Sequence, residues 1–458
     1  MEVLWILLKQ KISMLQLQGT YKEIISISIP IFFSSLAWNV ISLTDNAFLG
    51  KVGKVELGAI AIASIFYVCL LTLVMGFSRA FQIIVSRKLG EQKPTEVGAI
   101  FNQIFFTSAI IFVLMGAVSW FTTSFILQAT LSSNAVATAC STFIKYRSIS
   151  LPFEIVATML AAFFNGIGRN KIIITHSIVI IILNILFNYF LVFGNFGFPM
   201  MGIAGSGLAS ALSCIIGFFI LFFNVLRTKF VAMFGLFTSF KINWVLQKEL
   251  FLFSIPLVGQ LIIALISWLA FFILIENMGE HELAVSNLMK GIYMFFCIPI
   301  WALNSTTNTL ISNFNGQKKG ALMFVVLNKI LVISLALMSI CGVVFYVFNA
   351  YFFGLFTNDT SLISDANELL PIVLFCFIAF PISTTYFNSI VALEDGKASI
   401  LIELVNVAVY LLFLFYVAKS MHASLFTVWC AEFFYWTSLG FCCLIYFKVY
   451  KRHKKFYL

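Results

Sequence analysis

The chain repeats itself at a constant spacing of 226 residues. The triplet Ser-Ile-Pro at residues 28–30 recurs at residues 254–256. Further pairs at the same offset are Lys22/Lys248, Glu23/Glu249, Gly53/Gly279, Glu56/Glu282, Tyr67/Tyr293, Gly90/Gly316 and Asn102/Asn328. Similar composition in two apolar segments would not keep prolines, glycines and charges in one register. The pattern predicts two structurally equivalent halves, an architecture that many membrane transporters share.

The composition indicates that both halves lie in a membrane. Hydrophobic residues make up 61% of the chain and charged residues only 10%, which excludes a soluble globular domain. A helix needs roughly 20 apolar residues to span a bilayer. We expect twelve spans, near residues 24–49, 57–85, 96–121, 139–167, 172–194, 201–226, 250–276, 283–313, 321–349, 368–392, 398–418 and 424–448.

These spans define an all-α polytopic membrane protein of two six-helix repeats. Because six is an even number, both repeats enter the membrane from the same side and are parallel. The expected organisation is an interfacial N-terminal segment (1–23), an N-lobe (24–226), a connector (227–249), a C-lobe (250–448) and a basic tail (449–458). The lysine-containing first 18 residues show no small-residue cleavage site, so we interpret them as an interfacial lead-in and not as a signal peptide.

The basic residues predict the orientation. Twenty of the 28 lysines and arginines fall before the first span, in alternate loops, in the connector or in the tail. Six, among them Lys145 and Arg147, fall near the other face. The positive-inside rule places both termini and the connector in the cytoplasm, as in a multi-pass plasma (inner) membrane protein. The net charge of +10 then reflects topology and attraction to anionic lipid, not nucleic-acid binding.

No residue pattern suggests covalent chemistry. The nine cysteines form no Cys-x-x-Cys pair, and we interpret them as buried small apolar residues. No His-Glu cluster, glycine-rich phosphate loop or nucleophile motif is present in the sequence. We therefore expect neither an enzyme nor a cofactor.

Four acids fall well inside the predicted spans, namely Asp45, Glu154, Glu403 and Glu432, and Glu276 lies close to the end of one. A carboxylate there costs several kcal/mol, so it usually faces a water-filled cavity or a partner. Asp45 lies fifteen residues after Pro30, and its repeat mate is Phe271, so the duplication is broken at this position. One lobe carries an ionisable group where the other carries an apolar ring.

The expected helices at residues 172–194 and 201–226 carry polar residues that suit a site around Asp45. Asn184 and Asn188 are four residues apart and share one helix face, as do Ser206 and Ser210. Small residues at the start of helix 6 allow close helix approach. These amides and hydroxyls are either interhelical hydrogen-bonding groups or, together with Asp45, a cation site. If Na⁺ is the cation, Asp45 is a metal ligand.

In these segments the chain resembles the multidrug and toxic compound extrusion (MATE) family of cation-coupled antiporters. The resemblance rests on Pro30 followed by Thr44-Asp45-Asn46, on Ser86-Arg87-Lys88-Leu89-Gly90, on Pro152 with Gly166 and Gly168, on Asn184-Ile-Leu-Phe-Asn188, and on Gly202, Gly205 and Ala209-Ser210. It implies two six-helix lobes around a central cavity, with coupling ions bound in the N-lobe. Many relatives carry an acid on the seventh or tenth helix, and this chain has none in the interior of either expected helix (250–276 and 368–392). The expected helix at 250–276 instead offers Gln260 and Trp268 as cavity residues.

Glu403, in the expected helix at 398–418, has two interpretations, as a residue of the C-lobe cavity or as an acid near the cytoplasmic boundary.

Pro30 and Pro256 each remove a backbone hydrogen bond within a span and so create a bend or hinge. Two functions follow. The first is H⁺- or Na⁺-coupled export of amphipathic, cationic or aromatic small molecules by a monomer. The alternative is a flippase for a lipid-linked oligosaccharide or another lipid precursor. Such flippases more often have fourteen helices and a cationic cavity. Here twelve spans are expected, and Arg79, near the end of the second, is the only clear intramembrane cation of the first half, which favours export.

Overall fold

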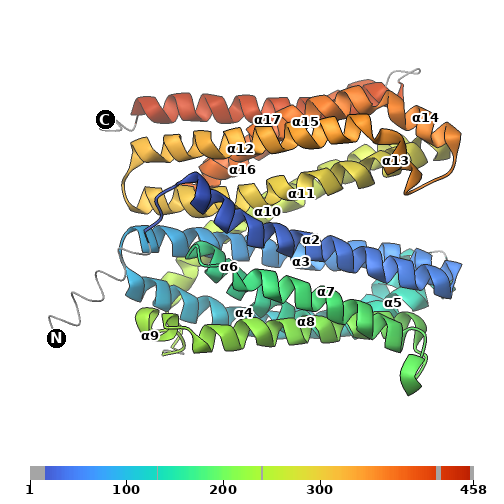
Figure 1. The fold of residues 1–458 in the computed structure, drawn as a ribbon, viewed down its shortest axis with the longest axis horizontal. Helices are drawn as coiled ribbons and strands as arrows, with labels where there is room; N and C mark the ends of the chain where they lie inside the picture. The colour runs from blue at the N-terminus through green and yellow to red at the C-terminus, as the bar shows by residue number, and fades with distance from the viewer. Residues whose placement is uncertain (1–15, 132, 239–240, 419–423, 454–458) are drawn as a thin grey trace. The chain divides into compact units, whose positions relative to one another are not determined.

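The structure, a computed structural model, describes residues 16–131, 133–238, 241–418 and 424–453 (Figure 1). Most of the predicted N-terminal segment and the end of the basic tail lie outside these ranges. Within them the chain forms helices and no strand. The helices are α2 (Tyr21–Val52), α3 (Lys54–Gly90), α4 (Pro94–Thr130), α5 (Asn134–Ser148), α6 (Leu151–Gly166), α7 (Ile172–Leu191), η1 (Asn195–Gly197), α8 (Gly202–Arg227), α9 (Phe230–Phe234), α10 (Trp244–Glu276), α11 (Glu280–Gly316), α12 (Gly320–Val347), α13 (Asn349–Gly354), α14 (Thr360–Glu368), α15 (Leu370–Ala392), α16 (Gly396–Ala418) and α17 (Leu425–His453).

The described helices supply the expected number of membrane spans. Eleven are long and apolar enough to cross a membrane alone, and the bent pair α5 and α6 makes a twelfth. This pair bends by 56° at the break between Ser148 and Leu151. Pro152 opens α6, where the lack of an N–H costs no helical hydrogen bond. The prediction of twelve spans is confirmed, and the fourth of them is broken.

The chain divides into two compact units that exchange the starts of two equivalent helices. Among the described residues, the first unit comprises residue 16 and residues 29–254, and the second comprises 17–28 and 255–453. The two boundaries inside helices differ by the repeat offset of 226, since 254 − 28 = 226. Pro30 in α2 and Pro256 in α10 each lie two residues after such a boundary. The two predicted bending points therefore mark the places where the chain passes from one unit to the other.

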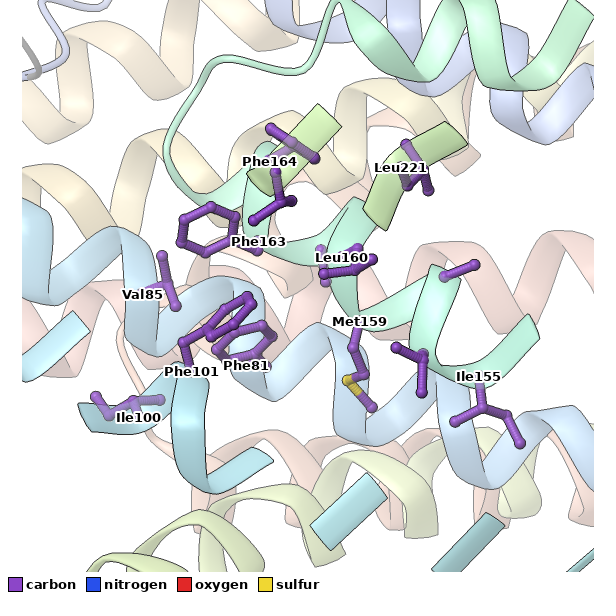
Figure 2. Packing of buried hydrophobic residues seen from close by; sticks show 14 of the residues in the cluster. Phe81, Val85, Ile100, Phe101, Ile155, Met159, Leu160, Phe163, Phe164 and Leu221 are labelled. Carbon is purple, nitrogen blue, oxygen red and sulfur yellow. The ribbon is translucent and has the colours of Figure 1, made fainter. Parts of the chain in front are cut away.

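The first unit packs around phenylalanine-rich contacts among α3, α4 and α6 (Figure 2). Phe101 packs edge-to-face on Phe163, with ring centroids 5.0 Å apart, and it also contacts Phe81. Each of these three side chains is at most 2% exposed. Gly166 lets α6 approach α3 closely, because a Cβ at this position would lie 2.8 Å from the Gln82 carbonyl oxygen. This core supports α7 and α8, which run alongside each other (Figure 1).

The second unit packs α11, α12, α15, α16 and α17 against one another. The start of α2 and the residues just before it belong to this unit, and polar contacts to α11 and α12 hold them. The Ser28 and Thr306 hydroxyls are 2.9 Å apart, and Lys329 Nζ donates to the Gly19 carbonyl at 3.1 Å. Gly19 has φ +65°, and a Cβ there would clash with Val326. Lys329, a cation inside a predicted span, thus has a structural role in this unit.

Candidate functional site

Asp45 is buried in the first unit and accepts hydrogen bonds from two other helices. Asn188 Nδ2 donates to Asp45 Oδ1 at 2.8 Å, and Asn184 Nδ2 lies 3.3 Å from the same oxygen. The Ser210 hydroxyl donates to Asp45 Oδ2 at 2.8 Å and accepts from Asn184 Nδ2 at 2.8 Å. Asp45 is 5% exposed, and the other three residues are 1% exposed or less. The structure thus brings together four of the five residues that the sequence suggested for a cation site.

The positions of these side chains follow from helix geometry and from small residues. Asn184 and Asn188 lie one turn apart on α7, so both amides face α2. Gly205 of α8 is packed on the end of α7, where a Cβ would lie 2.4 Å from the Leu191 carbonyl oxygen. A Cβ on Gly207 would lie 2.7 Å from the Phe143 carbonyl oxygen of α5. The absence of these side chains lets α8 approach both helices closely enough for Ser210 to reach Asp45.

The site carries unsatisfied acceptors as well as a carboxylate. Asn184 Oδ1, Asn188 Oδ1 and the Ser206 hydroxyl are buried without a hydrogen-bond partner in the described part of the chain. Ser206 makes no hydrogen bond to Asp45 there, although it lies one turn from Ser210 on α8. Buried oxygens without partners are costly, and a cation or a proton donor would relieve that cost. The donor set of one carboxylate, two amide oxygens and hydroxyls suits a hard cation such as Na⁺, and the carboxylate suits a proton.

A second buried acid of the first unit, Glu154 of α6, is paired with a cation. Arg147 of α5 lies 3.2 Å from Glu154, and the Tyr67 hydroxyl of α3 donates to the same carboxylate at 2.5 Å. Arg147 also donates to the Ser210 carbonyl at 3.0 Å. The charge pattern places Arg147 near the outer face, whereas the structure buries it to 4% exposure. An arginine and a glutamate seven residues apart in an apolar segment were the sequence signal for this pair.

The three residues suggested for the substrate cavity lie in the second unit, each with a different partner. Gln260 Nε2 donates to the Ser399 hydroxyl at 2.7 Å. Glu403, 3% exposed, accepts from the Tyr435 hydroxyl at 2.6 Å. Trp268 instead lies under the Lys290 ammonium, which is 4.6 Å from its ring centroid. Glu403 is therefore a buried, hydrogen-bonded acid about two turns into α16, and nothing in the described contacts assigns it to a cavity.

The repeat shows how the equivalent place in the second unit has diverged. At the offset of 226, Asp45 corresponds to Phe271, Asn184 to Tyr410 and Ser206 to Glu432. Phe271 packs edge-to-face on Trp429, and the Tyr410 hydroxyl donates to Glu432 at 3.2 Å. The second unit thus has an acid on α17 among aromatic rings, whereas the first has an acid on α2 among amides and hydroxyls. Only the first arrangement offers several neutral oxygen ligands.

Two duplicated helical units, twelve membrane spans and a buried carboxylate with unsatisfied oxygen neighbours are typical of a membrane transporter. The sequence matches the MatE family model over residues 30–190 and 256–429. This is more than half of the chain, so the protein belongs to the MatE family.

The curated relatives include several probable multidrug resistance proteins called NorM. The protein from Bacillus subtilis (strain 168) is 27% identical over 241 residues, which is 52% of each chain. The protein from Neisseria meningitidis serogroup B is 24% identical over 75% of each chain, and that from Bacillus anthracis is 22% identical over 91% of each chain.

Solved structures of low sequence identity share the fold. A variant of the Vibrio cholerae MATE transporter VcmN matches with a TM-score of 0.87 at 17% identity, covering 98% of this chain and 99% of that chain. A MOP superfamily transporter from Pyrococcus furiosus matches with a TM-score of 0.88 at 14% identity, covering 97% of this chain and 98% of that chain. These matches confirm the all-α fold, and the match to the MatE model confirms the family suggested by the sequence.

Proposed function

We propose that this protein is a cation-coupled antiporter that exports amphipathic small molecules, cationic or aromatic in character, by alternating access. H⁺ or Na⁺ is the coupling ion, and the Asp45 site binds it. The names of the NorM relatives support the substrate class, since each is a probable multidrug resistance protein. The protein acts as a monomer. Both termini and the connector lie in the cytoplasm, because most basic residues lie in those segments and in alternate loops.

The observation that carries this proposal is the contrast between the two buried acids of the first unit. Glu154 has a salt bridge to Arg147. Asp45 has only neutral hydrogen-bond donors, two amides and one hydroxyl, and makes no salt bridge within the described ranges. A buried carboxylate without a counter-ion is expensive, so it binds a proton or a metal cation. Asp45 is therefore the acid of this unit that is suited to exchange a cation.

Cation binding at Asp45 gives the chain a way to couple two processes. An ion shifts a conformational equilibrium only by its differential affinity for the two states. The site joins α2, α7 and α8, and α2 also carries Pro30 at the boundary between the units. We infer that a cation draws these three helices together and bends α2 at Pro30, and that this change releases the substrate on the outer side.

No specific observation favours the flippase alternative. Recognition of a pyrophosphate-linked lipid needs unpaired cations in the membrane interior. In the described part of the first unit, the buried Arg147 is neutralised by Glu154. Lys329 of the second unit donates to the Gly19 carbonyl and lies over the Tyr21 ring.

The proposal is tested by the ion that drives export. Purified protein in liposomes loaded with ethidium should release the dye faster when a pH gradient or a Na⁺ gradient is imposed, each in the absence of the other. A response to only one gradient identifies the coupling ion. If neither gradient accelerates release, and the protein is folded by its circular dichroism spectrum, the proposed antiport is wrong.

We expect the two prolines next to the unit boundaries, Pro30 and Pro256, to differ in the effect of their removal. Pro30→Ala should slow gradient-driven efflux more than Pro256→Ala at equal protein level, because α2 carries both the bend and Asp45 whereas α10 carries Phe271 at the equivalent position. Initial rates of ethidium efflux measure this. Equal losses in the two variants would mean that both prolines serve only the shape of their units.

A further inference from the structure

The buried ion pair next to the Asp45 site calls for an explanation beyond stability. Arg147 and Glu154 are 4% and 5% exposed, and the Arg147 guanidinium also lies over the Tyr67 ring, 4.6 Å from its centroid. Exchanging a buried ion pair for apolar residues is often neutral or stabilising, because desolvation offsets the attraction. The chain nevertheless places two opposite charges within one bent membrane span, on either side of the break between α5 and α6.

The pair is joined to Asp45 through Ser210. Arg147 Nη1 donates to the Ser210 carbonyl at 3.0 Å, and the Ser210 hydroxyl donates to Asp45 Oδ2 at 2.8 Å. Arg147 thus holds the backbone of the residue that binds Asp45, and its charge acts on the Asp45 carboxylate. The three ionised groups together carry a net charge of −1, which one monovalent cation neutralises.

We propose that Arg147 and Glu154 form a charge-balanced pair that sets the affinity of the Asp45 site for its coupling cation and limits that site to one cation, with Arg147 as a positioning residue for Ser210. This inference rests on the proposed function of Asp45. Because Glu154 neutralises it, the guanidinium does not replace the cation at Asp45. Because Arg147 neutralises it, Glu154 does not bind a cation of its own.

Among the described residues, three other titratable groups lie near this cluster, namely a thiol, a phenol and an imidazole. Cys214 of α8 accepts a hydrogen bond from Arg147 at 3.3 Å. The Tyr67 hydroxyl of α3 is bonded to Glu154. His176 of α7 lies against Gly217 of α8, two turns from Asn184 along the helix. Arg147 and Glu154 are therefore the groups whose removal changes the local charge.

The test compares Glu154→Gln, Arg147→Met and the double variant with the native protein in ethidium-loaded liposomes. The quantity measured is the concentration of the coupling cation that gives half-maximal efflux. Glu154→Gln leaves an unpaired positive charge and should raise this concentration by about tenfold or more, since a unit charge at this range acts strongly in a low dielectric. Arg147→Met leaves an extra acid and should lower it. The double variant restores the charge balance, so it should shift this concentration less than either single variant, and the shift that remains measures the loss of the Arg147 contact to Ser210.

Tyr67→Phe separates charge from packing. This variant removes the hydrogen bond to Glu154 but leaves both charges, so it should lower the melting temperature and hardly change the half-maximal concentration. Shifts of the same sign in both single variants, a double variant worse than either, or a Tyr67→Phe shift as large as that of Glu154→Gln would each overturn the inference. The double variant adds no unpaired charge to that of Asp45, so it tests the inference even if a single variant fails to fold. An Asp45→Asn protein that still couples would instead refute the proposed function itself.

Discussion

Asp45→Asn should reduce gradient-driven efflux to the rate of protein-free liposomes while leaving the protein folded. The amide has the size and shape of the carboxylate, so its oxygen can still accept from Asn188 and Asn184 and its NH₂ can donate to the Ser210 hydroxyl. The variant loses only the charge that binds and releases a cation. Removal of a buried charge that lacks a salt bridge does not lower the free energy of unfolding, and it can raise it.

Three measurements decide this prediction: ethidium efflux under the driving gradient, ethidium binding without a gradient, and the melting temperature. We expect the first to be lost, the second to be retained and the third to be unchanged or raised. Asn188→Ala should weaken coupling less, because it removes a hydrogen-bonding partner and not the charge. Glu276→Gln, at the exposed end of α10, is the control for a carboxylate-to-amide change. Native efflux in Asp45→Asn would exclude the site, and Glu403 would then be the next acid to test.

Much of the fold and the centre of the site followed from the sequence for identifiable reasons. Spans are set by hydrophobic length, and matches at a constant offset of 226 between Lys22 and Asn102 indicate how the spans of the two halves pair. Asp45 stood out because its repeat mate is Phe271. Asn184, Asn188 and Ser210 stood out because spacings of four residues align side chains on one helix face. Local rules of this kind hold in the structure because each helix must satisfy its own backbone in the membrane.

The features that sequence reasoning missed depend on contacts between distant segments. The units exchange residues 17–28 and the start of α10, and no local pattern shows that Gly19 is held by Lys329 or that Gln103 and Gln247 meet. The charge pattern predicts Arg147 near the outer face, but it does not predict that the side chain is buried. The break between α5 and α6 sets it opposite Glu154, so that each charge supplies the partner that makes burial of the other tolerable.

Gly205→Ala should impair both stability and cation coupling, because it acts on the helix contact that assembles the site. A Cβ at this position would lie 2.4 Å from the Leu191 carbonyl oxygen and 2.6 Å from the carbonyl carbon. Backbone atoms cannot move aside as a flexible side chain would, so α8 must shift away from α7. Overpacking of this kind typically costs about 1–3 kcal/mol. The shift would also lengthen the 2.8 Å hydrogen bond between Asn184 and Ser210 and weaken the grip on Asp45.

Gly58→Ala is the matched control, since a Cβ at this exposed position of α3 meets no atom within 4 Å. Alanine is favoured over glycine in a helix by roughly 0.5–1 kcal/mol, so this variant should be as stable as the native protein or slightly more stable. Melting temperatures and half-maximal cation concentrations are measured side by side. In Gly205→Ala the melting temperature should fall and the half-maximal concentration should rise, whereas Gly58→Ala should match the native protein or be slightly more stable. If Gly205→Ala melts and couples like Gly58→Ala, close contact between α7 and α8 is not what places Ser210 at Asp45.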